Sequence, residues 1–140
     1  MFQKMTVIGN LGGDPTMRYM PDGTAVTNFS VAVSRKWKDN NVDKQQTTWF
    51  RVSVFGKQAE NANQYLVKGQ KVHVEGFLQS DPSTGGPRIY QRQDGTAGAS
   101  FELRANAITY LGKPQDAVDE LFNPSNGVKT DVPVEDEIPF

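Results

Sequence analysis

Aromatic and basic side chains share one face of the segment Thr47–Phe55. In an extended strand, successive side chains point to opposite faces. One face of this segment therefore carries Thr48, Phe50, Val52 and Val54, and the other carries Trp49, Arg51, Ser53 and Phe55. The first face suits a core. The second face exposes two large rings and a cation, which is unfavourable unless a ligand or a partner covers them.

Trp37 lies among cations a short distance before this segment, and its neighbours are Arg35, Lys36 and Lys38. Aromatic rings stack with nucleic-acid bases for about 1–3 kcal/mol each, and cations neutralise phosphates. These residues are therefore typical of a surface that binds single-stranded nucleic acid. The alternation alone leaves a second interpretation open, in which the rings pack between subunits or beneath a loop.

Few residues of this chain could catalyse a reaction. His73 is the only histidine and there are no cysteines, which excludes His-pair metal sites and thiolate chemistry. The segment Gly9–Gly13 lacks the Lys-Ser/Thr pair of a phosphate-binding loop. We expect a binding protein rather than an enzyme, with no cofactor and no bound metal.

Two kinds of sequence periodicity, helical spacing and strand alternation, predict the elements that position these residues. Gly56–Leu66 has helical spacing, whereas Lys38–Gln46 and Asp81–Ser100 are expected to be loops. Alternating apolar residues predict five strands: Lys4–Leu11, Thr24–Ser34, Thr47–Phe55, Lys71–Ser80 and Phe101–Leu111. In the last strand, the core face is predicted to carry Phe101, Leu103, Ala105 and Ala107. This order predicts an all-β, five-stranded barrel of the oligonucleotide/oligosaccharide-binding (OB) type, with one helix between its third and fourth strands.

The formal net charge of −1 conceals two parts of opposite sign. Residues 1–112 carry 13 basic and nine acidic residues, whereas residues 113–140 carry two basic residues, seven acidic residues and four of the eight prolines. We therefore predict an OB-fold domain over residues 1–112 and a disordered acidic tail over residues 113–140.

Any single surface lysine is more often a solubilising group than a contact. The candidate phosphate contacts are Lys4, Arg18, Arg35, Lys36, Lys38, Lys44, Arg51, Lys57 and Lys68.

The last six residues combine acids with apolar side chains: Glu135, Asp136, Glu137, Ile138, Pro139 and Phe140. Such a segment can place a ring and the terminal carboxylate in a partner's pocket while the acids meet a basic rim. We therefore predict that the tip binds partner proteins. A purely solubilising tail is the alternative, but it does not explain Ile138 and Phe140 at the very end.

The sequence also predicts a cellular location. No apolar run approaches the roughly 20 residues of a membrane span, and the first residues lack the apolar core of a signal peptide. A chain without cysteines suits a reducing compartment. We expect a cytoplasmic protein with no membrane contact.

Several segments resemble the bacterial-type single-stranded DNA-binding protein (SSB) family. The matching segments are Val7–Pro15, Arg18–Gly23, Thr48–Val52, Val54–Lys57, Ala59-Glu60, Tyr65–Gly69, Val74–Gly76 and the terminal Ile138–Phe140. They cover most of residues 4–80 and the tip. The resemblance implies an OB-fold core, usually a homotetramer, that coats single-stranded DNA without strong sequence preference. It also implies a bacterial, nucleoid-associated protein.

The resemblance implies roles for individual residues as well. Trp37, Trp49 and Phe55 would stack with bases, and the acidic tip would recruit replication, recombination and repair proteins. Members of the family often carry another aromatic residue soon after the fourth strand, but Gln79–Pro82 has none. We expect Tyr90 to take this role.

Two other functions remain open from the sequence. One is a primosome-type OB-fold adaptor, in which DNA binding is secondary. Such proteins typically lack an acidic tip, so Glu135–Phe140 disfavours this alternative. The other is a nuclease or phosphotransferase built on an OB core, which the lack of His pairs, cysteines and a phosphate-binding loop disfavours.

Overall fold

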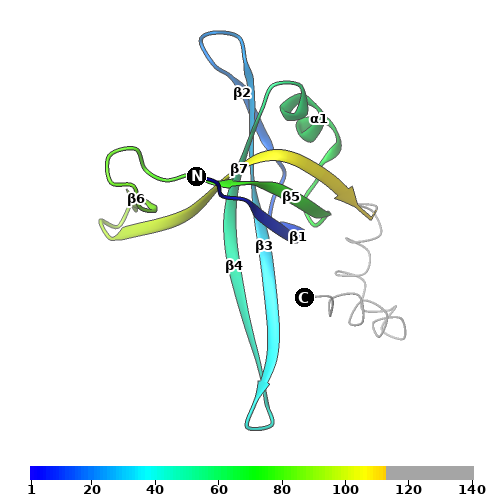
Figure 1. The fold of residues 1–140 in the computed structure, drawn as a ribbon, viewed down its shortest axis with the longest axis vertical. Coiled ribbons are helices and arrows are strands. Elements are labelled where there is room, and N and C mark those ends of the chain that lie inside the picture. The colour runs from blue at the N-terminus through cyan, green and yellow to red at the C-terminus, as the bar shows by residue number, and fades with distance from the viewer. Residues whose placement is uncertain (113–140) are drawn as a thin grey trace.

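A computed structural model describes residues 1–112 of the chain (Figure 1). Along the chain, the elements are β1 (Met5–Leu11), β2 (Thr16–Tyr19), β3 (Ala25–Asp39), β4 (Val42–Phe55), α1 (Lys57–Tyr65), β5 (Lys71–Leu78), β6 (Arg88–Gln91) and β7 (Ala97–Leu111). The predicted acidic tail and its tip lie outside the described residues.

Five of the strands close into a barrel. Their order is β1-β5-β7-β4-β3, and β1 closes the ring by pairing Asn10 and Leu11 with β3. Neighbouring strands are antiparallel except β4 and β7, which run parallel. Helix α1 lies between β4 and β5 in the chain. The predicted all-β barrel with one helix between its third and fourth strands is therefore confirmed.

The barrel interior is filled by apolar side chains from every second strand position. Burial of one Val or Leu side chain contributes about 1.5–3 kcal/mol relative to exposure. In β4, Phe50, Val52 and Val54 are buried while Trp49 and Arg51 are exposed, as the alternation predicts. The fully buried apolar side chains include Val31, Val52, Val72, Val74 and Leu103.

The alternation reverses within β7. The pairing with β5 skips Asn106, which makes a β-bulge. Beyond the bulge, Ile108 packs against the core and Ala107 is exposed. The prediction that Ala107 faces the core is therefore wrong. The prediction that Phe101 faces the core is also wrong: Phe101 precedes Leu103, the first residue of β7 that pairs with β5, and is 52% exposed.

β3 and β4 extend beyond the barrel as a two-stranded ribbon (Figure 1). Their pairing continues to Asp39 and Val42, and the turn consists of Asn40 and Asn41, with φ of 52° and 63°. Asparagine tolerates the left-handed conformation that two-residue hairpin turns require. The prediction of a loop over Lys38–Gln46 is therefore wrong, because a ribbon that is solvated on both faces needs no apolar alternation.

A second hairpin projects from the barrel within the segment that we expected to be a loop (Figure 1). β6 pairs with the first part of β7, with Tyr90 opposite Gly98. In the turn, the hydroxyl and the amide of Thr96 donate to Asp94 (2.7 and 3.0 Å) and hold the pKa of this carboxyl below its usual range. The loop prediction for Asp81–Ser100 is therefore wrong over β6 and the start of β7.

Helix α1 is attached to β3 by a buried hydrogen bond. The hydroxyl of Thr27, which is fully buried, donates to the carbonyl oxygen of Ala59 at 2.6 Å. Ala59 and Ala62 form the buried side of the helix, and Gly56 precedes it with a φ of 76°. Within residues 1–112, no helix has the length and apolar character needed to cross a membrane.

Replacing Thr27 with Val should lower the free energy of unfolding by about 1 kcal/mol, because it removes this buried hydrogen bond with little change in volume. Urea unfolding at a fixed protein concentration would measure the change. The control is Thr109→Val at an exposed position of β7, which should stay within about 0.5 kcal/mol of the unmodified protein. Equal effects of the two substitutions would show that the hydrogen bond does not stabilise the helix.

Candidate nucleic-acid interface

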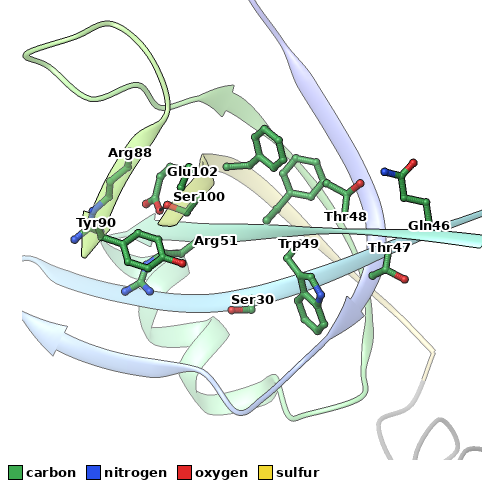
Figure 2. Close-up of a pocket in the computed structure, with 13 residues that line it drawn as sticks. Ser30, Gln46, Thr47, Thr48, Trp49, Arg51, Arg88, Tyr90, Ser100 and Glu102 are labelled. Atoms are coloured by element: carbon green, nitrogen blue, oxygen red, sulfur yellow. Dashed lines mark hydrogen bonds between the residues drawn. The ribbon is translucent and has the colours of Figure 1, made fainter. Parts of the chain in front are cut away.

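Small residues on β3 lie opposite large residues on β4, and this difference in size leaves a groove. Ser30 pairs with Arg51, and Ala32 pairs with Trp49. Two adjoining hollows of about 680 and about 630 Å³ lie over this face and share Ser30, Trp49, Arg51 and Arg88 in their walls. We call them together the β4 groove, and Figure 2 shows the side chains that line the 680 Å³ hollow. Its walls come from β3 and β4, from the segment after β1, from β2 and from the β6–β7 hairpin.

Three aromatic rings line the β4 groove: Trp49, Tyr90 and Phe101. Their residues are 54%, 41% and 52% exposed. Figure 2 shows Trp49 on the same side of β4 as Thr47, which the alternation predicts. Phe101 packs against Phe50, with ring centroids 5.9 Å apart. Each exposed ring offers a flat apolar surface on which a planar ligand can stack.

The β4 groove also carries charge. Three arginines line it, one each from β2, β4 and β6: Arg18, Arg51 and Arg88. Two carboxylates line it as well, but both already accept hydrogen bonds. Asp14 accepts one from the backbone amide of Lys68 (2.9 Å), and Glu102 accepts one from the hydroxyl of Ser100 (2.6 Å). The three guanidinium groups outnumber the two carboxylates of the groove. Arginine suits phosphate because of its planar set of donors.

Trp37 lies on the opposite face of the β3–β4 ribbon from Trp49. Trp37 pairs with Lys44, whereas Trp49 pairs with Ala32, and these two positions of β3 have opposite parity. The guanidinium carbon of Arg35 lies 4.8 Å from the centre of the Trp37 ring. The structure therefore does not bring the two tryptophans together on one face. A ligand that touched both would have to pass around the ribbon.

Phe55 does not line the β4 groove. It stands at the end of β4, and the guanidinium carbon of Arg104 lies 4.1 Å from its ring centre. One face of the Phe55 ring is therefore already covered by a cation, which contributes about 0.5–1 kcal/mol at an exposed site.

The nine predicted phosphate contacts fall into three groups. Arg18 and Arg51 line the β4 groove. The second group, on the β3–β4 ribbon, consists of Arg35, Lys36, Lys38 and Lys44, with Lys44 3.4 Å from Asp39. The third group lies elsewhere, with Lys4 paired to Glu75 (3.1 Å), and consists of Lys4, Lys57 and Lys68.

Two residues of the groove, Arg88 and Phe101, are not among the site residues predicted from the sequence. Arg88 lies in a segment predicted to be a loop, although Arg88, Tyr90 and Arg92 recur with period two, which is typical of a strand. For Phe101, the sequence predicts a position in the core. Among residues 1–112, no three His, Asp or Glu side chains gather in a way that could hold a metal ion.

Solved structures share this fold. A small single-stranded DNA-binding protein from Streptomyces coelicolor superposes with a TM-score of 0.65 at 25% identity, covering 78% of this chain and 94% of that one. An SSB of Plasmodium falciparum, solved in complex with single-stranded DNA, superposes with a TM-score of 0.64 at 24% identity, covering 80% and 97%. Both support the OB-type barrel.

Relatives in sequence cover the same region. The single-stranded DNA-binding protein of Neisseria meningitidis serogroup A is 44% identical over 110 residues, which are 78% of this chain and 59% of that protein. The chain thus spans about three fifths of this relative's length. Single-stranded DNA-binding protein 1 of Xylella fastidiosa is 40% identical over 115 residues, covering 81% and 79%. A family model described as "Single-strand binding protein family" matches residues 2–111, and the chain therefore belongs to the single-strand binding protein family.

Proposed function

We propose that the chain binds single-stranded DNA in the β4 groove, without strong preference for sequence. The observation that supports this most directly is the groove itself, in which the rings of Trp49 and Tyr90 lie beside Arg51 and Arg88. The names of its relatives support the same ligand. Membership of the single-strand binding protein family also means that the chain is a binding protein rather than an enzyme.

In this proposal, bases stack on the rings and the arginines hold the phosphates. Every base has a flat face, so stacking tolerates any sequence. The DNA strand continues from the β4 groove along the β3–β4 ribbon. There, Lys36 and Lys38 lie on the same face of β3 as Ala32, which pairs with Trp49. It reaches Trp37 only by passing around the ribbon. Phe55 and the cations Lys4, Lys57 and Lys68 extend the contact beyond the groove.

We further propose the biological setting that the resemblance implies. The chain protects single-stranded DNA during replication, recombination and repair in the bacterial cytoplasm, associated with the nucleoid. Residues 1–112 are the binding domain. Residues 113–140 are the acidic tail, whose tip, Glu135–Phe140, recruits partner proteins.

We propose that the protein is a homo-oligomer, most simply a homotetramer. β1 pairs with β5 from Met5 to Asn10, but with β3 only through Asn10 and Leu11, so most of its other edge has no partner strand among residues 1–112. Exposed edges favour pairing with another chain. Leu78, at the end of β5, is 42% exposed, and a second copy could cover this apolar surface.

Oligo(dT) should quench the tryptophan fluorescence of the protein, because stacked bases contact the indole rings. The affinity should fall as salt rises, because phosphate contacts release counterions. Trp49→Ala should weaken binding by about 1–3 kcal/mol, and Trp49→Phe should weaken it less because a ring remains. Absence of quenching at low salt would contradict the proposal, and an unchanged affinity of Trp49→Ala would remove this ring from the site.

Deleting residues 138–140 should leave the affinity for oligo(dT) nearly intact but abolish capture of replication and repair proteins from a bacterial extract. The reason is that the apolar end of the tip would fill the partner's pocket. A chain whose last six residues are reversed in order keeps the same composition and charge and serves as the control. If the reversed tip captures as much as the natural one, the tail acts only through its charge.

The native protein should have four times the chain mass of 15.5 kDa, and in the presence of oligo(dT) it should have this mass plus that of the bound oligonucleotide. Native mass spectrometry would measure it. Leu78→Lys should lower the mass, because it would place a charge in the proposed apolar contact between copies. A monomer mass for the unmodified protein would exclude the oligomer and leave DNA binding untouched.

A further inference from the structure

We propose that Gly12 and Gly98 are positioning residues for the two rings Trp49 and Tyr90. Each glycine lies directly against one ring, and each fixes where that ring stands in the β4 groove. This inference rests on the proposed binding of single-stranded DNA. It adds two residues with no functional side chain to the set on which stacking depends.

Gly12 follows β1 and contacts the Trp49 ring. A Cβ at this position would lie 2.8 Å from Cη2 of Trp49 and closer still to Cζ3. Real Cβ atoms do not approach other atoms so closely, so the indole would have to move. The Gly12 amide donates to the Ser30 carbonyl oxygen at 3.0 Å, which fixes the backbone on the β3 side. Gly12 does not have a positive φ, so the backbone conformation does not require glycine here.

Gly98 has the same relation to Tyr90 on the opposite wall. The two residues are paired across the β6–β7 hairpin. A Cβ on Gly98 would lie 2.7 Å from Cζ of Tyr90 and 2.9 Å from Cζ of Arg92. Arg92 also donates to the Ala97 carbonyl oxygen at 2.6 Å, and its guanidinium carbon lies 5.7 Å from the centre of the Tyr90 ring. Gly98 is buried beneath these side chains and does not have a positive φ.

At other positions of the barrel, glycine is required because neighbouring backbone leaves no room for a Cβ. A Cβ on Gly9 would meet the carbonyl oxygen of Ala32, and one on Gly76 would meet that of Arg104. Those contacts are with backbone, so substitution there would disturb the sheet itself. At Gly12 and Gly98, the nearest atoms belong to the ends of side chains, which can rotate. Substitution should therefore move the rings while the barrel stays folded.

The chain supplies matched controls for both positions. A Cβ on Gly13 would meet no atom within 4 Å, and one on Gly86 would meet only Oγ1 of Thr84 at 3.7 Å. Neither residue has a positive φ. A Gly→Ala change at any of these four positions reduces the freedom of the unfolded chain to a similar extent. The difference between Gly12→Ala and Gly13→Ala therefore measures the effect of the contact with the Trp49 ring. The difference between Gly98→Ala and Gly86→Ala does the same for Tyr90.

The first experiment measures the position of the Trp49 ring in the free protein. In a Trp37→Phe background, Trp49 is the only fluorophore of its kind. Gly12→Ala should change the emission maximum and the accessibility of Trp49 to acrylamide, whereas Gly13→Ala should change neither. Identical spectra for the two variants would overturn the assignment of Gly12. This measurement does not depend on DNA, so it tests the position of the ring even if the unmodified protein does not bind oligo(dT). Absence of binding would contradict the proposed function but not the role of Gly12.

The second experiment asks whether each glycine acts through its ring. With fluorescently labelled oligo(dT), Gly12→Ala should weaken binding roughly tenfold, about the loss of one stack. In a Trp49→Ala background the same change should have no further effect, because the ring that it displaces is gone. Gly98→Ala should behave likewise with Tyr90→Ala, and Gly86→Ala should bind as the unmodified protein does. A loss that persists without the ring would show that the glycine acts in another way.

Discussion

The register between β3 and β4 is the constraint on which the rest of the structure depends. It places Phe50 and Val52 toward the core, and it places Arg51 opposite Ser30 and Trp49 opposite Ala32 on the outer face. A shift by one residue would reverse every side chain of β4, because the side-chain period of a strand is two. The same pairing therefore stabilises the barrel and builds the groove. A change that weakened the core pairing would also displace the rings.

The sequence was sufficient to predict the barrel strands because their period is set by burial. A strand with one face in the core must alternate, and this pattern located the barrel strands and the outward face of Trp49. The ribbon beyond the barrel has no buried face, so its residues from Lys38 to Gln46 have no apolar period. The bulge at Asn106 could not be predicted either, because it depends on how β5 and β7 pair across the barrel.

Part of the candidate site likewise could not be predicted from the sequence. Arg88 and Tyr90 reach the groove only because β6 pairs with β7 and β7 pairs with β4. The cation over Phe55 comes from Arg104, 49 positions further along the chain. The face of Trp37 follows from its pairing with Lys44, which lies in the segment predicted to be a loop. Contacts between residues so far apart in sequence depend on the tertiary pairing rather than on local pattern.

The charge of the groove depends on arrangement rather than on the total. The whole chain has a formal net charge of −1, yet three arginines from three strands converge on one face. The two carboxylates there, Asp14 and Glu102, accept hydrogen bonds from protein donors, and the three guanidinium groups outnumber them. Two glycines also contribute to this arrangement, because they have no side chain. Space beside Trp49 and Tyr90 exists because Gly12 and Gly98 carry no Cβ, so the positions of the rings are set by backbone that approaches them closely.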